Sequence, residues 1–321
     1  MRILSPARRG HPQLVHRATL ITAIAGLVAA CSGSVGVVGP VPTPAADRVI
    51  VELPNASPGT SPVASAGPIS TPSTSSAPTT TVRVYLFQPD VAGGDAHLVP
   101  VVRTVTATRA VATAAVRELL VGPMPAEHGL VTMIPAGTQL LGVTIDSRVA
   151  TVDLTGTFES GGGSASMLGR LAQLVYTVTQ FPTADTIRLR LDGQPVESIG
   201  GEGVMVGAGL GRTDSTSSLP QIFVDSPAWG DAFPSPGRVT GLANVFEAQF
   251  RLQVLDGGRR VLADTPVQAT CGTGCWGTFD VTVAYSVTTA QWGTLRVFDP
   301  SAKDGTPADV REYPVWLTPA G

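Results

Sequence analysis

The sequence has little of what most enzyme and metal sites are built from. Among 321 residues there are three cysteines and four histidines, and only 5% of the residues are aromatic. Two histidines, His11 and His16, lie within the first 30 residues, so only His97 and His128 remain beyond them. No cluster has metal-ligand spacing, and no serine or cysteine has a recognisable base. We therefore expect no catalytic residues, no metal and no cofactor, and the chain is not predicted to be an enzyme.

Positive charge is also scarce. Four of the 21 basic residues, but none of the 24 acidic ones, lie in residues 1–30. Without that segment the chain has 17 basic and 24 acidic residues, a net charge of −7. This balance argues against a nucleic-acid partner, because proteins that bind nucleic acids gather Lys and Arg on one face.

No apolar run is long enough to be a comfortable permanent membrane span. The best candidate, residues 18–30, follows a basic start and ends in small residues directly before Cys31. These are features of a cleaved signal peptide. Residues 1–30 are therefore predicted to be removed, and the cysteine count then leaves an even pair, Cys271 and Cys275, in an oxidising compartment.

The cleavage region, Val28-Ala29-Ala30-Cys31, resembles the lipobox of bacterial lipoproteins. The resemblance implies that the Cys31 thiol is diacylated and becomes the new N-terminus. The expected location is the extracytoplasmic face of the bacterial cell membrane, with the lipid as the membrane contact. The alternative is an ordinary secretory peptide with a chance cysteine, and the pattern does not distinguish Sec from twin-arginine export.

Residues 31–80 are predicted to be a disordered tether. Nine prolines fall between Pro40 and Pro78, among Ser, Thr, Ala and Gly. Such a composition has too little apolar surface to offset the entropy of ordering. The expected role is to carry folded domains away from the membrane.

Cys271 and Cys275 enclose the short sequence Gly-Thr-Gly, which can close a tight loop. A disulfide is expected here. Zinc is an alternative that needs two further ligands, and no His or Cys lies nearby. Two reduced thiols are the remaining possibility.

Residues 81–200 show the pattern of one α/β domain. Two apolar β runs, 82–87 and 98–106, precede a helical pattern at 110–120 that Gly122-Pro123 stops. Alternation at 140–146 and 149–154 predicts a hairpin around Ser147-Arg148. A second helix is expected after Gly163, capped by Ser164 and ended before Pro182, followed by a strand at 187–191 and a turn at Asp192-Gly193.

This part resembles the sporulation and spore germination domain called GerMN. The resemblance is carried, in the family's order, by the residues 84–86, 98–103, 119–123, 134–138, 150–154, 172–177, 181–183 and 191–193. It implies a small sheet backed by two helices, akin to ring-building motifs of envelope assemblies, with no known chemistry.

Residues 201–218 are rich in Gly, Ser and Thr and are predicted to be a linker that leaves its neighbours separable. The alternating glycines of Gly207-Ala208-Gly209-Leu210-Gly211 neither follow a clear strand nor open a helix, as a nucleotide-binding loop would. About seven short β runs then follow within 219–318, separated by turn signals, which predicts a β-sandwich. The expected fold class is thus α+β.

The second part resembles the immunoglobulin-like domain of bacterial spore germination, which often follows GerMN. The matching residues are 222–227, 239–247, 276–279, 293–297, 301 and 304–305, of which Asn244-Val245-Phe246-Glu247 is the most distinctive run. Cys271 and Cys275 depart from the family pattern.

These observations predict a non-catalytic, membrane-anchored lipoprotein that binds or scaffolds other cell-envelope components. The partners are envelope proteins or cell-wall polymer, and a role in spore germination is not fixed by the family alone. The alternative is a binding protein for wall glycan or a small ligand. Candidate partner residues are Trp229 and Trp292, which can stack on sugar, and Glu247, expected to be half-buried. A hydrolase is the other rival class, but it would need a nucleophile–base pair, and the sequence shows none. The oligomeric state is open.

Overall fold

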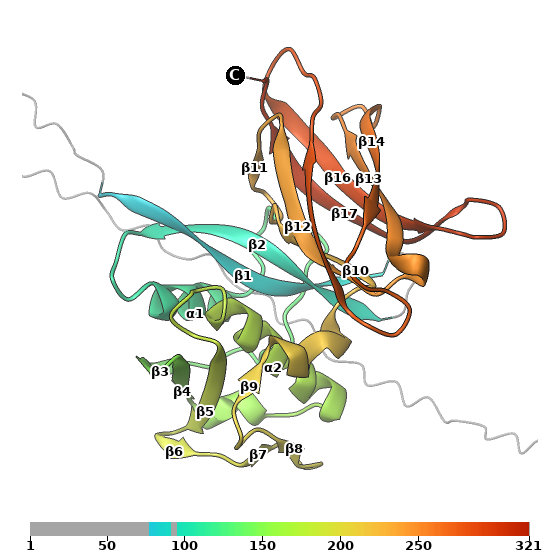
Figure 1. The fold of residues 1–321 in the computed structure, drawn as a ribbon. Coiled ribbons are helices and arrows are strands. Elements are labelled where there is room, and N and C mark those ends of the chain that lie inside the picture. Colours follow the sequence, from blue (N-terminus) through green and yellow to red (C-terminus); the bar gives the residue numbers. More distant parts are fainter. Residues whose placement is uncertain (1–76, 91–94, 321) are drawn as a thin grey trace, which may run out of the picture. The chain divides into compact units, whose positions relative to one another are not determined.

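The computed structural model describes residues 77–90 and 95–320. Cys31, the predicted signal peptide and nearly all of the predicted tether lie outside the described residues. The described chain holds two α-helices, α1 (Val111–Val121) and α2 (Ser164–Val178) (Figure 1). Among these residues no helix is both long and apolar enough to cross a membrane.

The strands fall into five sheets. The first part contains β1 (Thr79–Pro89), β2 (Ala96–Thr106), β3 (Leu140–Asp146), β4 (Val149–Leu154), β5 (Thr186–Leu191), β6 (Gln194–Pro195), β7 (Ser198–Ile199), β8 (Val204–Met205) and β9 (Leu210–Gly211). The second contains β10 (Ile222–Ser226), β11 (Ala232–Phe233), β12 (Gly237–Ala243), β13 (Gln249–Leu255), β14 (Val261–Gln268), β15 (Gly277–Val283), β16 (Gln291–Pro300) and β17 (Pro307–Leu317). Three 3₁₀ segments are η1 (Gly156–Glu159), η2 (Arg212–Ser218) and η3 (Phe246–Ala248).

In the first part, the two helices lie between two sheets. On one side is the antiparallel ribbon β1–β2, and on the other is a sheet of order β3-β4-β5-β6, in which β9 also pairs with β5 (Figure 1). Both helices contact β1, while α1 also contacts β3 and α2 contacts β5. The expected single sheet backed by helices is therefore two sheets with the helices between them.

This arrangement explains why α2 is buried on nearly every side. From Gly169 to Val178 all of its residues are buried, including the polar Arg170, Gln173 and Thr177. Buried polar groups need hydrogen-bond partners, and these side chains find them on the loops and on β1. The helix begins differently from the expectation: Gly163 is the N-cap, and the Ser164 hydroxyl donates to the Glu202 carboxylate instead of accepting a hydrogen bond from the helix backbone.

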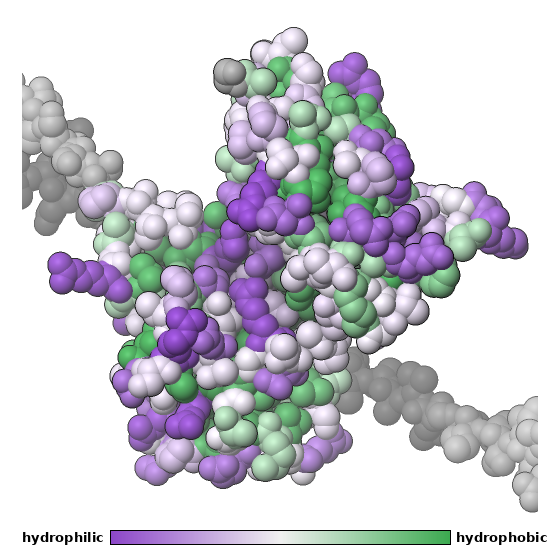
Figure 2. Space-filling model, viewed as in Figure 1, coloured by the Kyte–Doolittle hydropathy of each residue, from purple (hydrophilic) through white to green (hydrophobic). Residues whose placement is uncertain are grey.

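The second part is a β-sandwich, as expected. A three-stranded sheet, β10-β12-β15, faces a five-stranded sheet, β11-β17-β16-β13-β14. Phe250 of β13 and Phe279 of β15 meet edge to face between the sheets, with ring centroids 4.9 Å apart. On the outer faces, charged residues pair across strands, as in Arg238–Asp280 and Arg251–Asp264. Figure 2 shows the resulting mixture of hydrophilic and hydrophobic residues on one face.

The stretch 201–218 differs from a plain linker. It contains β8, β9 and η2, and Arg212 at the start of η2 reaches into both parts. Buried residues of the two parts, such as Tyr85 and Phe223, belong to one hydrophobic cluster. The expectation of two separable units is therefore opposed by the contacts between them.

Candidate functional site

Trp229 and Trp292, which are 63 positions apart in the chain, line one apolar groove of about 370 Å³. Trp229 lies in the loop after β10, and Trp292 lies at the start of β16. The floor and walls are completed by Val101 and Val102 of β2 and by Pro314 of β17. The groove is thus formed jointly by the two parts of the chain, and it has the volume of a small-ligand site.

The positions of both tryptophans are fixed by neighbouring strands. Trp229 pairs with β2 through its backbone: its N–H donates to Pro100 O at 2.8 Å, and its carbonyl accepts from Val102 N at 3.1 Å. Trp292 stands opposite Trp316 in the β16–β17 ladder, and the two rings meet edge to face at 5.3 Å. The Trp292 side chain nevertheless remains open to solvent, with 54% of the residue exposed. An exposed indole held from behind by a second indole offers a flat, rigid contact surface.

The groove carries no free carboxylate. Glu127 lines it, but this carboxylate is bound by the Arg103 guanidinium and also accepts from Met124 N at 2.8 Å. His128, one of the two histidines beyond residue 30, is exposed and also lines the groove. The lining is therefore mainly apolar with neutral hydrogen-bonding groups, which suits an uncharged ligand better than an ionic one.

The ribbon β1–β2 is closed to strand addition at the positions that usually receive an added strand. On the β1 edge, Gln180 donates to Arg83 O at 2.7 Å and accepts from Arg83 N at 2.8 Å, as a neighbouring strand residue would. At Tyr85, the Thr177 hydroxyl accepts from the backbone N–H, and the Gln173 side chain donates to the backbone carbonyl. The backbone N–H and carbonyl of Phe87 are both bonded to the backbone of Val131. The β2 edge is covered by Trp229. Capped edges protect a sheet from unwanted pairing.

The two parts are joined by a buried polar cluster. The Tyr85 hydroxyl donates to Asp225 at 2.5 Å, and Arg212 Nη1 lies 3.1 Å from the other carboxylate oxygen of Asp225. The Arg212 guanidinium also lies over the Tyr176 ring, 4.6 Å from its centroid. Burial raises the pKa of Tyr85 and raises that of Tyr176 to about 12, so both phenols stay neutral at physiological pH.

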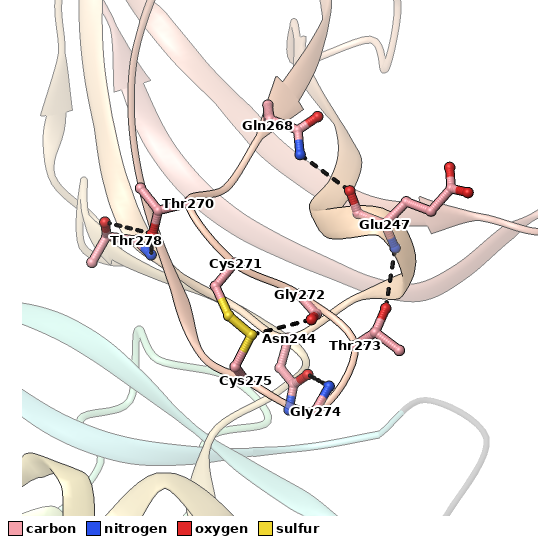
Figure 3. The surroundings of a disulfide bond; sticks show 10 residues. All are labelled: Asn244, Glu247, Gln268, Thr270, Cys271, Gly272, Thr273, Gly274, Cys275 and Thr278. Carbon is pink, nitrogen blue, oxygen red and sulfur yellow. Dashed lines mark hydrogen bonds between the residues drawn. A yellow bond between two sulfur atoms is a disulfide. The ribbon is translucent and has the colours of Figure 1, made fainter.

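Glu247 does not belong to the groove and is not half-buried as expected. It is exposed on η3, where its backbone is held by the loop between Cys271 and Cys275 (Figure 3). In the structure these two cysteines form a disulfide, with Cα atoms 5.9 Å apart. Of the other two tryptophans, Trp276 packs against the core, and Trp316 packs against the Trp292 ring.

In residues 77–90 and 95–320 no group of three or more His, Cys, Asp or Glu side chains is placed to hold a metal ion. The Ser164 hydroxyl faces the Glu202 carboxylate with no histidine between them. The Gly207–Gly211 stretch runs into β9 and not into an α-helix. At none of these positions does a nucleophile lie beside a histidine base.

The fold and the groove together define the class: an α+β domain followed by an immunoglobulin-like sandwich, with a ligand-sized groove that both line. Residues 83–197 match the family described as sporulation and spore germination, and residues 221–306 match the immunoglobulin-like domain of bacterial spore germination. The chain therefore carries one domain of each family, in that order. Neither description names an enzymatic activity.

Three solved structures with similar parts are from Clostridium perfringens and Bacillus subtilis. A candidate lipoprotein from Clostridium perfringens is 20% identical over 42% of this chain and 89% of its own, with a TM-score of 0.31. The first GerMN domain of the sporulation protein GerM from Bacillus subtilis is 21% identical over 42% of this chain and 98% of its own (TM-score 0.33). The tandem GerMN domains of that protein are 14% identical over 64% of this chain and 62% of their own (TM-score 0.36). No curated protein matches the chain.

Proposed function

We propose that this chain is a non-catalytic binding protein of the bacterial envelope, held at the extracytoplasmic membrane face by a lipid on Cys31. Its binding site is the groove lined by Trp229 and Trp292, and its ligand is an uncharged sugar chain of the cell wall. The observation that carries the proposal is the meeting of these two distant tryptophans in one groove.

The chemistry of the groove supports a sugar over an extended peptide. Indole rings stack on the apolar faces of sugar rings, and the neutral lining imposes no charge on the ligand. An extended peptide would need free backbone groups on a neighbouring strand, but those of β2 at Pro100 and Val102 are already bonded to Trp229. A role as a non-catalytic protein is supported by the lack of an assembled reactive pair among the described side chains.

The test is a titration of the soluble mature chain with a tetramer of N-acetylglucosamine, followed by tryptophan fluorescence and by co-sedimentation with purified peptidoglycan. Trp229→Ala and Trp292→Ala should each weaken binding at least about tenfold. Trp276→Phe is the matched control, since Trp276 does not line the groove. Equal binding by all three variants would remove the groove from the proposal, and hydrolysis of the peptidoglycan would contradict a non-catalytic role.

A second candidate, scaffolding of an envelope protein, is favoured by the edge strand β3. This strand ends its sheet and exposes Leu141 and Ile145, of which 51% and 38% are accessible. Exposed edges with apolar side chains can accept a strand from a partner. Ile145→Lys should abolish such a complex and leave sugar binding unchanged, whereas the tryptophan variants should do the reverse.

A further inference from the structure

Phe246 is the only phenylalanine of the described chain among the large apolar side chains that are exposed, with 61% of the residue accessible. The neighbouring Glu247 is also exposed, and in Figure 3 its carboxylate points away from the disulfide loop. No hydrogen bond or ion pair within the described residues uses that carboxylate, whereas the exposed carboxylates of Asp264 and Asp280 on the sandwich are ion-paired. Within the described residues, an exposed apolar ring thus stands beside a carboxylate that has no hydrogen-bond or ion-pair partner.

The backbone at this position is strained. Glu247 and Ala248 have φ angles of +53° and +58°, in the left-handed region that side chains disfavour. The only other pair of consecutive non-glycine residues with positive φ in the described chain, Ser147 and Arg148, closes the two-residue hairpin between β3 and β4, which requires this conformation. Glu247 and Ala248 close no such hairpin, because they lead directly into β13. Strain of this kind persists only where surrounding contacts enforce it.

The enforcing contacts come from the loop that the disulfide closes and from Gln268 at the end of β14. Thr273 N donates to Val245 O at 3.0 Å, and the Thr273 hydroxyl accepts from Glu247 N at 3.2 Å. Gly274 N donates to the side chain of Asn244 at 2.8 Å, and Gln268 donates to Glu247 O at 3.1 Å (Figure 3).

The two loops also approach too closely for a side chain between them. A Cβ on Gly272 would lie 2.4 Å from Val245 O, so only glycine fits there. The loop from Cys271 to Cys275 therefore acts as a rigid support for the turn that displays Phe246 and Glu247.

We propose that Phe246 and Glu247 form a docking tip for a protein partner, presented by the disulfide-closed loop. The partner fits the tip if it offers an apolar socket for the ring and a lysine or arginine at the rim of that socket for the carboxylate. A membrane surface fits less well, because anionic lipids repel a carboxylate placed beside the inserting ring. This tip is separate from the tryptophan groove and does not depend on the proposed sugar ligand.

The tip can be tested with a photoreactive phenylalanine analogue placed at position 246 of the full chain in the cells that produce it. The matched control carries the analogue at Val261, which is also exposed and apolar but lies on β14. We expect a discrete protein adduct from position 246 and none from position 261. Adding Glu247→Gln, or Cys271→Ser with Cys275→Ser, should lower the yield at least about fivefold. Crosslinking to lipid alone, no discrete adduct, or an adduct that persists undiminished in both variants would each overturn the proposal.

A measurement on the pure protein separates recognition from a structural role of Glu247. Glycine adopts positive φ without cost, so Glu247→Gly should raise the thermal midpoint of the pure protein by roughly 2–4 °C. The same substitution should abolish the crosslinked adduct in cells. A lower midpoint would mean that the glutamate side chain supports the fold, and the docking tip would be rejected.

Discussion

Arg212 Nη1 lies 3.1 Å from Asp225 Oδ2, and this contact joins the start of η2 to the first strand of the sandwich. Both side chains are roughly three-quarters buried, with 29% and 25% exposed. Because Tyr85 donates to the same carboxylate, the ion pair connects β1, η2 and β10 at one point. The tryptophan groove is lined by β2 and by the sandwich, the two parts of the chain that this junction joins.

Removing the arginine should destabilise the chain clearly. Arg212→Met leaves the Asp225 charge partly buried without its cation, and we expect the free energy of unfolding to fall by about 2 kcal/mol. Arg238→Met is the control, because its pair with Asp280 is far more exposed and should change stability by less than about 0.5 kcal/mol. Urea denaturation gives the free energy of unfolding of both variants. Equal losses would show that the pair at the junction stabilises the chain no more than an exposed ion pair does.

The contacts across the junction also predict cooperative unfolding. Tyr85, Tyr176 and Phe223 pack ring against ring across the two parts, so a fragment of residues 81–200 or 219–318 exposes aromatic surface that the joined chain buries. We expect residues 81–318 to unfold in one calorimetric transition, and each fragment to melt at a lower temperature. Two independent transitions that match those of the fragments would instead support the separable domains expected from the sequence.

Gln180, which lies just beyond the end of α2, should contribute to stability and prevent association. Gln180→Ala leaves the N–H and C=O of Arg83 without partners on a strand edge, which should cost about 1–2 kcal/mol. The uncovered edge should also promote association, visible by light scattering during size-exclusion chromatography. Gln139→Ala, at an exposed loop position, should do neither. A fully monomeric and stable Gln180 variant would contradict the edge-capping role.

The disulfide can be tested by intact mass. The exported chain should be lighter by two hydrogen atoms than its reduced form and should take up alkylating reagent at positions 271 and 275 only after reduction. Because the closed loop is short, the Cys271→Ser, Cys275→Ser variant should lose only about 2 kcal/mol of stability and still fold. Alkylation of both thiols without a reductant would contradict the bond.

Lipidation of Cys31 is a prediction from the sequence alone. Cys31→Ala should leave the chain unacylated, and either uncleaved or shed from the cells. Mass spectrometry of the N-terminal peptide of the wild type should find a diacylated cysteine at position 31. An unmodified N-terminus at another position would identify an ordinary secretory peptide instead.

The local patterns of the sequence were sufficient for most of the elements. Alternation around Ser147-Arg148 predicted β3 and β4 with the bounds that the structure has, because register and turn are both encoded within a few residues. The helical spacing at 110–120 likewise predicted α1 to within one residue. Resemblance to two families supplied the class of each part.

What the sequence could not supply were contacts between distant segments. Gln173 and Thr177 look like a solvent-facing side of α2, yet they face β1, since a second sheet covers the helix. Trp229 and Trp292 were predicted together as candidate sugar-stacking residues, but the groove that both line is formed by contacts that only the fold supplies. Glu247 was expected to be half-buried in the sandwich, but its backbone is left-handed and the residue is exposed.

The pairing of β1 with β2 determines how the folded part would respond to a pull. The two strands are in register over their full length, from Thr79 opposite Thr106 to Pro89 opposite Ala96. The segment that precedes the folded part enters it at Thr79, so tension from that side acts along the axis of β1. Ladder hydrogen bonds lie across that axis, and α2 holds β1 from its other edge. Such a load acts in shear on many bonds at once, the geometry that resists force best, so the β1–β2 ribbon is the part of the fold suited to bear tension applied at Thr79.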